Sequence, residues 1–101
     1  MSQPTVLLVD DEVNVLSSLR RSLRREAWHV VTASSPEEAL SQLDEIAPSL
    51  VVSDQQMPGM TGIEFLTEAG RRLPHLRRVL LTGWPEMVTP REIEAAGIDA
   101  V

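Results

Sequence analysis

The chain has 101 residues, of which 43% are apolar and 24% are charged, a composition that suits one compact globular domain. Its apolar stretches are far shorter than the roughly 20 residues that cross a bilayer, and its N-terminus lacks the features of a secretory signal. We therefore expect a cytoplasmic protein without a membrane segment. The net charge of -6 disfavours direct binding to nucleic acid, and the absence of cysteine excludes disulfides and thiolate metal sites.

Strand and helix patterns alternate from the N-terminus. Residues 5–9 form an apolar, β-branched run that predicts a strand, and an acidic triplet begins directly after it at Asp10. Residues 13 to about 26 predict a helix, because apolar side chains recur three and four positions apart on one face: Val13, Leu16, Leu19, Leu23 and Ala27. Residues 28–32 predict a second strand.

A second helix and a third strand follow. Ser35 and Glu38 have the spacing of a capping box, with Pro36 at the first helical position, so we expect a helix from there to Pro48. Its inward face consists of apolar residues at helical spacing: Ala39, Leu40, Leu43 and Ile46. Residues 50–54 predict a buried strand that ends on a carboxylate, Asp54.

The remaining chain repeats this alternation. Residues 57–62 have the glycine and proline content of a loop. A third helix is expected as far as Pro74, with an apolar face of Ile63, Leu66, Ala69 and Leu73. Residues 79–81 predict a fourth strand that exits at Thr82, and residues 86–96 predict a weaker helix that Pro90 interrupts and Gly97 caps. Residues 98–101 open a fifth strand.

This alternation predicts an α/β fold with a mainly parallel sheet between helices. Ligands bind such sheets beyond the carboxyl ends of the strands, where Asp10, Asp11, Asp54 and Thr82 would meet. Three neighbouring carboxylates persist at neutral pH only with raised pKa values or with a cation among them. Each aspartate taken singly could instead cap a helix or make a turn.

Oxygen ligands of this kind favour Mg²⁺. A metal-bound aspartate at a strand end can attack phosphorus and form an acyl phosphate. A haloacid-dehalogenase-like phosphatase also uses such an aspartate, but it needs a second, general-acid aspartate two positions later. Gln56 occupies that position and cannot supply a proton.

The combined motifs resemble the receiver domain of two-component response regulators. They are Val9-Asp10-Asp11-Glu12, Asp54 followed by Met57-Pro58-Gly59-Met60, and Leu81-Thr82-Gly83. By this resemblance, residues 1–101 form one receiver domain, not an enzyme. The implied fold is a flavodoxin-like, doubly wound parallel sheet with strand order 2-1-3-4-5 and five helices, here incomplete at the C-terminus.

The resemblance also implies a role for each residue at the site. Asp54 would accept a phosphoryl group from a sensor histidine kinase or a phosphotransfer protein. Asp11, Asp54 and the backbone carbonyl of Gln56 would ligate Mg²⁺, and Asp10 would act through a bound water. Thr82 would be the switch hydroxyl that relays phosphorylation to an output domain in the parent chain.

Two departures from the family pattern concern the end of the sequence. The family places a lysine about three positions beyond Val101, and Val101 itself stands where the family usually has an aromatic switch residue. We therefore expect a piece of a longer regulator, with Met1 opening the parent protein and its C-terminal strand and helix lacking. That loss predicts homo-oligomerisation through an exposed strand edge and an apolar patch around Val6, Leu8 and Val79 or Leu81.

Other functions stay open at this point. A receiver fold kept as a phosphorylation-independent adaptor or oligomerisation module is a distinct class of function, and the missing lysine favours it. The motifs at residues 54–60 and 82–85 look similar to receivers joined to cyclic-dinucleotide phosphodiesterase or kinase modules. Trp84, two residues after Thr82, is a candidate gate for the site.

Overall fold

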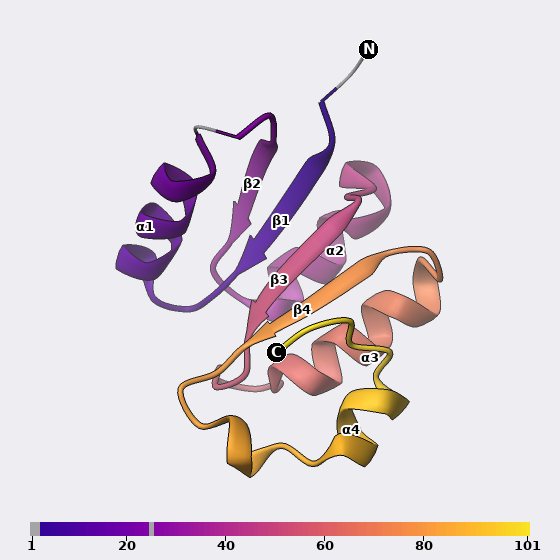
Figure 1. The fold of residues 1–101 in the computed structure, drawn as a ribbon. Coiled ribbons are helices and arrows are strands. Elements are labelled where there is room, and N and C mark those ends of the chain that lie inside the picture. The colour runs from indigo at the N-terminus through magenta and orange to yellow at the C-terminus, as the bar shows by residue number, and fades with distance from the viewer. Residues whose placement is uncertain (1–2, 25) are drawn as a thin grey trace.

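A parallel β-sheet with helices on both faces forms the core of the protein (Figure 1). The computed structural model describes residues 3–24 and 26–101. Over these residues the sheet has four strands: β1 (Thr5–Val9), β2 (His29–Ala33), β3 (Leu50–Asp54) and β4 (Arg77–Leu81). Their order is β2-β1-β3-β4, and every pairing is parallel, so the predicted fold class and the order of these strands are confirmed.

The two faces of the sheet carry different helices (Figure 1). Helix α1 (Val13–Arg24) covers one face, where Leu16 packs on Val6 and Leu8. Helices α2 (Pro36–Ile46) and α3 (Gly62–Arg72) cover the other face. Because β1 lies inside the sheet and alternates its side chains between the two faces, its residues 6–9 are buried throughout. None of the described helices is long and apolar enough to cross a membrane.

The predicted element boundaries need small corrections. Val13 is 67% exposed and Ala27 lies outside α1, because the helix starts beyond the end of the strands and ends at Arg24. Strand β2 begins at His29, one residue later than expected. Strand β4 begins two residues earlier than expected, at Arg77, since strand pairing continues through residues that are not apolar. Residues 1, 2 and 25, which the predicted domain and first helix include, lie outside the described residues.

Helix starts follow local capping chemistry. Ser35 Oγ accepts the amide of Glu38 at 3.1 Å, but the Glu38 carboxylate accepts from Ser34 rather than from Ser35, so only half of the predicted capping box forms. Thr61 and Glu64 form a full capping box at the start of α3, which was not predicted from the sequence.

The predicted helix over residues 86–96 is two elements. A 3₁₀ turn, η1 (Pro85–Met87), precedes helix α4 (Pro90–Ala95). Thr89 caps α4 in a second full capping box with Glu92. Pro90 lacks an amide hydrogen and therefore starts a helix here instead of continuing one. Gly97 has a φ of +68°, as expected for a glycine at a helix C-terminus.

The chain beyond α4 runs beside β4. Asp99 N donates to Arg78 O at 2.8 Å and Leu80 N donates to Ala100 O at 3.0 Å, and Val79 forms one parallel bridge with Ala100, so the predicted fifth strand over residues 98–101 is present only as this single bridge. The exposed apolar patch is smaller than the sequence predicts. Val6 and Leu8 are fully buried under α1, whereas Val79 is half-buried and Leu81 is 36% exposed.

Candidate functional site

Parallel pairing of β1 with β3 brings three carboxylates together. Val9 pairs with Ser53, so Asp10 and Asp54 occupy the next positions at the same edge of the sheet. One carboxylate oxygen each from Asp10, Asp11 and Asp54 lies within 4.8 Å of the others. Asp10 is buried, Asp54 is half-buried and Asp11 is exposed, so the cluster opens to solvent on the Asp11 side.

Burial governs the protonation of this cluster. It raises the pKa of the Asp10 carboxyl above its ordinary value, although the amide of Glu12, which Asp10 Oδ1 accepts at 2.9 Å, opposes the rise. Burial also raises the pKa of Asp54, although hydrogen bonds from the amides of Gln55 and Gln56 lower it in part. The negative charge of Asp11 adds to both increases. Ionising the cluster therefore costs free energy that a bound cation would offset.

The N-terminus of α3 fixes the loop that follows Asp54. Gln55 O accepts from Gly62 N, and Gln55 Oε1 accepts from Ile63 N, each at 3.0 Å. A side chain at Gly62 would collide with the backbone carbonyl oxygen of Asp54, so glycine allows this close approach. These contacts were not predicted from the sequence, because no local pattern signals a glutamine that caps a helix eight residues later.

Thr82 lies at the neighbouring strand end. Asp54 pairs with Leu81, and Gln55 N donates to Leu81 O at 3.1 Å, so Thr82 follows directly at the same edge. Its Oγ1 accepts the amide of Trp84 at 3.0 Å. Trp84 is 61% exposed beside this edge. Thr82 and Trp84 are therefore coupled through a hydrogen bond within the loop between β4 and α4.

The donor set fits a hard divalent cation. Three carboxylates at one opening supply oxygen ligands and two or three negative charges, which is the chemistry that Mg²⁺ requires. The Gln56 residue is exposed, and none of the hydrogen bonds found among the described residues uses its backbone carbonyl. His29 and His75 lie at the opposite, amino ends of β2 and β4, away from the carboxylates.

We expect the substitution Asp10→Asn to raise the melting temperature at pH 7 without divalent cations. Asparagine keeps an oxygen for the Glu12 amide but removes one of the crowded charges. Because the native pKa is raised, the native state holds the proton more strongly than the unfolded state, so wild-type stability falls as the pH rises above about 3.8. The gain should be a few degrees, since 1 kcal/mol corresponds to about 4–8 °C in a domain of this size.

The same gain should vanish below pH 3.8, the ordinary value for aspartate, where the wild-type carboxyl is protonated too. Thermal melts followed by circular dichroism between pH 3 and 7 measure both effects. Asp44→Asn, an exposed carboxylate on α2, is the matched control and should change little. An unchanged or lower melting temperature for Asp10→Asn at pH 7 would contradict the repulsion described above.

Comparisons with known proteins agree with this geometry. Residues 6–101 match the family model of the response regulator receiver domain. The hydrogenase transcriptional regulatory protein HoxA of Cupriavidus necator is 43% identical over 84 residues, which are 83% of this chain and 17% of that protein. The transcriptional regulatory protein AfsQ1 of Streptomyces coelicolor is 38% identical over 79 residues, or 78% of this chain and 35% of that protein. The chain thus spans about a third or less of the length of these relatives.

Solved structures show the same fold. The response regulator TrrA of Thermotoga maritima, in complex with Mg²⁺ and BeF, superimposes with a TM-score of 0.87 at 30% identity, over 96% of this chain and 83% of that one. The signal receiver domain of an HD domain-containing protein from Pseudomonas fluorescens gives a TM-score of 0.90 at 28% identity, over 99% and 74% of the two chains. With its strand order, its acidic cluster and these matches together, the chain belongs to the response regulator receiver domain family.

Proposed function

We propose that this receiver domain accepts a phosphoryl group on Asp54 from a phosphohistidine of a sensor histidine kinase or a phosphotransfer protein. One observation carries the proposal. Asp54 ends β3 inside a cluster of three carboxylates whose oxygens lie within 4.8 Å of one another. Such a cluster is costly unless a divalent cation offsets its charge, and a cation there is what phosphoryl transfer to a carboxylate requires.

The transfer follows from the chemistry of the groups. An Asp54 carboxylate oxygen attacks phosphorus, the bond between phosphorus and the histidine nitrogen breaks, and the nitrogen keeps the electron pair. The products are an acyl phosphate and, since the second ring nitrogen of the phosphohistidine carries a proton, a neutral imidazole. Asp11, Asp54 and the Gln56 backbone carbonyl would hold Mg²⁺, with Asp10 acting through a water. When bound, the ion neutralises charge on the transferring oxygens.

Thr82 would report the presence of the phosphoryl group. Its Oγ1 accepts the Trp84 amide, which leaves the hydroxyl hydrogen free to donate to a phosphoryl oxygen at the same edge. Movement of Thr82 toward Asp54 would shift the loop that carries Trp84. The receiver would in this way act as a conformational switch for an output domain in a longer regulator, working in the cytoplasm without contacting nucleic acid itself.

The first prediction concerns the phosphoacceptor. The natural chain that contains residues 1–101 should incorporate acid-labile phosphate from phosphoramidate or acetyl phosphate in the presence of Mg²⁺, and Asp54→Asn should abolish the incorporation. Intact-protein mass spectrometry measures the added mass. Asp44→Asn is a matched control that should label normally. Phosphate that persists in Asp54→Asn, or that maps to another aspartate, would favour the phosphorylation-independent adaptor.

The second prediction concerns the metal. Mg²⁺ should change the fluorescence of Trp84, measured in a Trp28→Phe background so that one tryptophan reports. Binding should be weak, because Mg²⁺ keeps several waters and few protein groups reach it. Asp11→Ala should weaken the apparent affinity at least tenfold, since second-shell losses alone cost about 10–100-fold. A titration curve that Asp11→Ala leaves unchanged would contradict the proposed ligand set.

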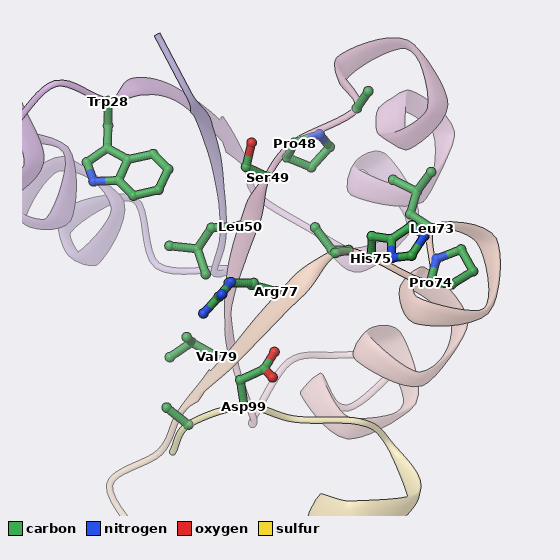
Figure 2. A pocket seen from close by; sticks show the side chains of 13 residues that line it. Trp28, Pro48, Ser49, Leu50, Leu73, Pro74, His75, Arg77, Val79 and Asp99 are labelled. Carbon is green, nitrogen blue, oxygen red and sulfur yellow. The ribbon is translucent and has the colours of Figure 1, made fainter.

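We also propose that copies of the chain associate along β4. A groove of about 890 Å³ runs beside this strand, lined in part by Trp28, Leu50, Val79 and Ala100 (Figure 2). Its wall is largely apolar, and apolar surface of this kind favours contact with another protein surface. Figure 2 shows Leu50 and Val79 in the lining of the groove with Arg77 between them, and a second copy would bury the two apolar side chains.

Light scattering over a dilution series tests the association. The 101-residue chain should form a dimer or a larger species, and Val79→Glu should shift it toward the monomer because a charge enters the groove. Val13→Glu places the same charge on an exposed residue of α1, away from the groove, and should leave the distribution unchanged. A folded monomer at every concentration, with a cooperative melt, would contradict this proposal.

A further inference from the structure

Arg78 links β4 to the end of α4 and to the chain that follows that helix. Arg78 lies on β4, and its Nη1 donates to the carbonyl of Ala96 at the end of α4, at 2.8 Å. Its Nε donates to Leu76 O at 3.1 Å. Its backbone pairs with Asp99, whose carboxylate accepts from Arg78 N and whose amide donates to Arg78 O, each at 2.8 Å. One residue therefore holds the end of α4 and the chain that follows it against β4.

Two glycines make room for the guanidinium group. A side chain at Gly70, in the last turn of α3, would collide with Arg78 Nη1 and Cζ. At Gly97 a Cβ atom would lie 2.5 Å from Nη1, and the φ of +68° independently favours glycine there. Glycine in a helix costs stability relative to alanine, so Gly70 is unfavourable for α3 taken alone. The guanidinium group occupies the space that this glycine leaves.

The contacts of Arg78 are with carbonyl groups rather than with acids. Over residues 3–24 and 26–101, the ion pairs found are those of Glu68 with Arg71 and Arg72, and none involves the Arg78 guanidinium. Ala96 O belongs to the last turn of α4, where carbonyls have no partner within the helix and carry partial negative charge. Arg78 therefore caps α4 from outside.

Helix α4 has few other attachments. None of its residues, Pro90–Ala95, is buried. Within the helix the half-buried Ile93 packs on the core, and buried residues lie at its two ends: Val88 before it and Ala96 and Ile98 after it. The Val88 end continues into the loop that carries Thr82 and Trp84. A displacement of Thr82 would therefore pull on one end of α4 while Arg78 holds the other.

We propose that Arg78 is a positioning residue that sets the free-energy cost of the receiver switch, by anchoring the C-terminal end of α4 in the arrangement seen here. This inference rests on the proposed function, because it assumes that a phosphoryl group at Asp54 draws Thr82 inward. The shift of α4 that follows works against the contact between Arg78 and Ala96. Loss of Arg78 should then favour the switched arrangement and tighten the binding of a phosphoryl mimic.

Two readouts on the natural chain test the proposal. Hydrogen exchange of amides 92–98 reports the anchor, and exchange should be at least about tenfold faster in Arg78→Gln than in wild type, as for a locally opened segment. Beryllofluoride with Mg²⁺ mimics the phosphoryl group, and its apparent Kd, read from Trp84 fluorescence in the Trp28→Phe background, should fall about fivefold in Arg78→Gln. Arg77→Gln, at the exposed neighbouring position on β4, is the matched control and should change neither readout.

A second variant tests the same contact without removing the arginine. Gly70→Ala fills the space beside the guanidinium group and improves the helix propensity of α3, so a fold that tolerates it is expected. It should speed exchange in α4 and tighten beryllofluoride binding in the same direction as Arg78→Gln. A merely structural arginine would speed exchange while leaving the beryllofluoride Kd unchanged or weaker.

The outcomes separate the two proposals. Faster exchange in α4 together with tighter beryllofluoride binding supports the anchor. Beryllofluoride affinity that is unchanged or weaker in both Arg78→Gln and Gly70→Ala overturns it, as does unchanged exchange in α4. Failure of the wild-type chain to bind beryllofluoride contradicts the proposed function instead, and the exchange data alone then decide whether Arg78 holds α4.

Discussion

The parallel pairing of β1 with β3 is the constraint on which the rest of the site depends. Both strands are mostly apolar and reach an aspartate at their carboxyl ends, Asp10 directly after β1 and Asp54 as the last residue of β3. Burying the two strands in register therefore brings Asp10, Asp11 and Asp54 together. The favourable burial of residues 6–9 outweighs the repulsion among the carboxylates. The fold thereby keeps an electrostatically costly cluster at one edge, and that cost supports the proposal that a cation, and then a phosphoryl group, binds there.

The elements around this cluster divide into rigid and loosely held parts. Gln55 and Gly62 hold the loop after Asp54 against the N-terminus of α3, which fixes the position of the proposed acceptor. On the other side, neither η1 nor α4 contains a buried residue, and among the described residues the hydrogen bond found for the Thr82 side chain is the one from the Trp84 amide. A site that is held firmly on one side and loosely on the other suits the proposed switch, in which a change in charge at Asp54 would move the more loosely held side.

Local patterns were enough to predict the strand ends and the acidic cluster, because an apolar run that stops at a carboxylate is visible in the sequence itself. The prediction that Val13 lies on the buried face of α1 was wrong, since helical spacing does not show where a helix extends past the sheet. The local patterns also missed Phe65, which is fully buried, and the contact of Arg78 with Ala96. Arg78 and Ala96 are 18 positions apart, and only the packed structure reveals which glycine leaves space for which side chain.

The central claim is that the three carboxylates at the carboxyl edge of the sheet bind a divalent cation at one shared site. Titration with Mn²⁺, a paramagnetic substitute for Mg²⁺, measures this most directly when nuclear magnetic resonance follows every backbone amide. The account predicts that resonances of residues 9–12 and 53–57 broaden first and together, and that excess Mg²⁺ restores them. Broadening that begins instead at the acidic residues of α2 or α4, or that spreads uniformly over the exposed carboxylates, would contradict it.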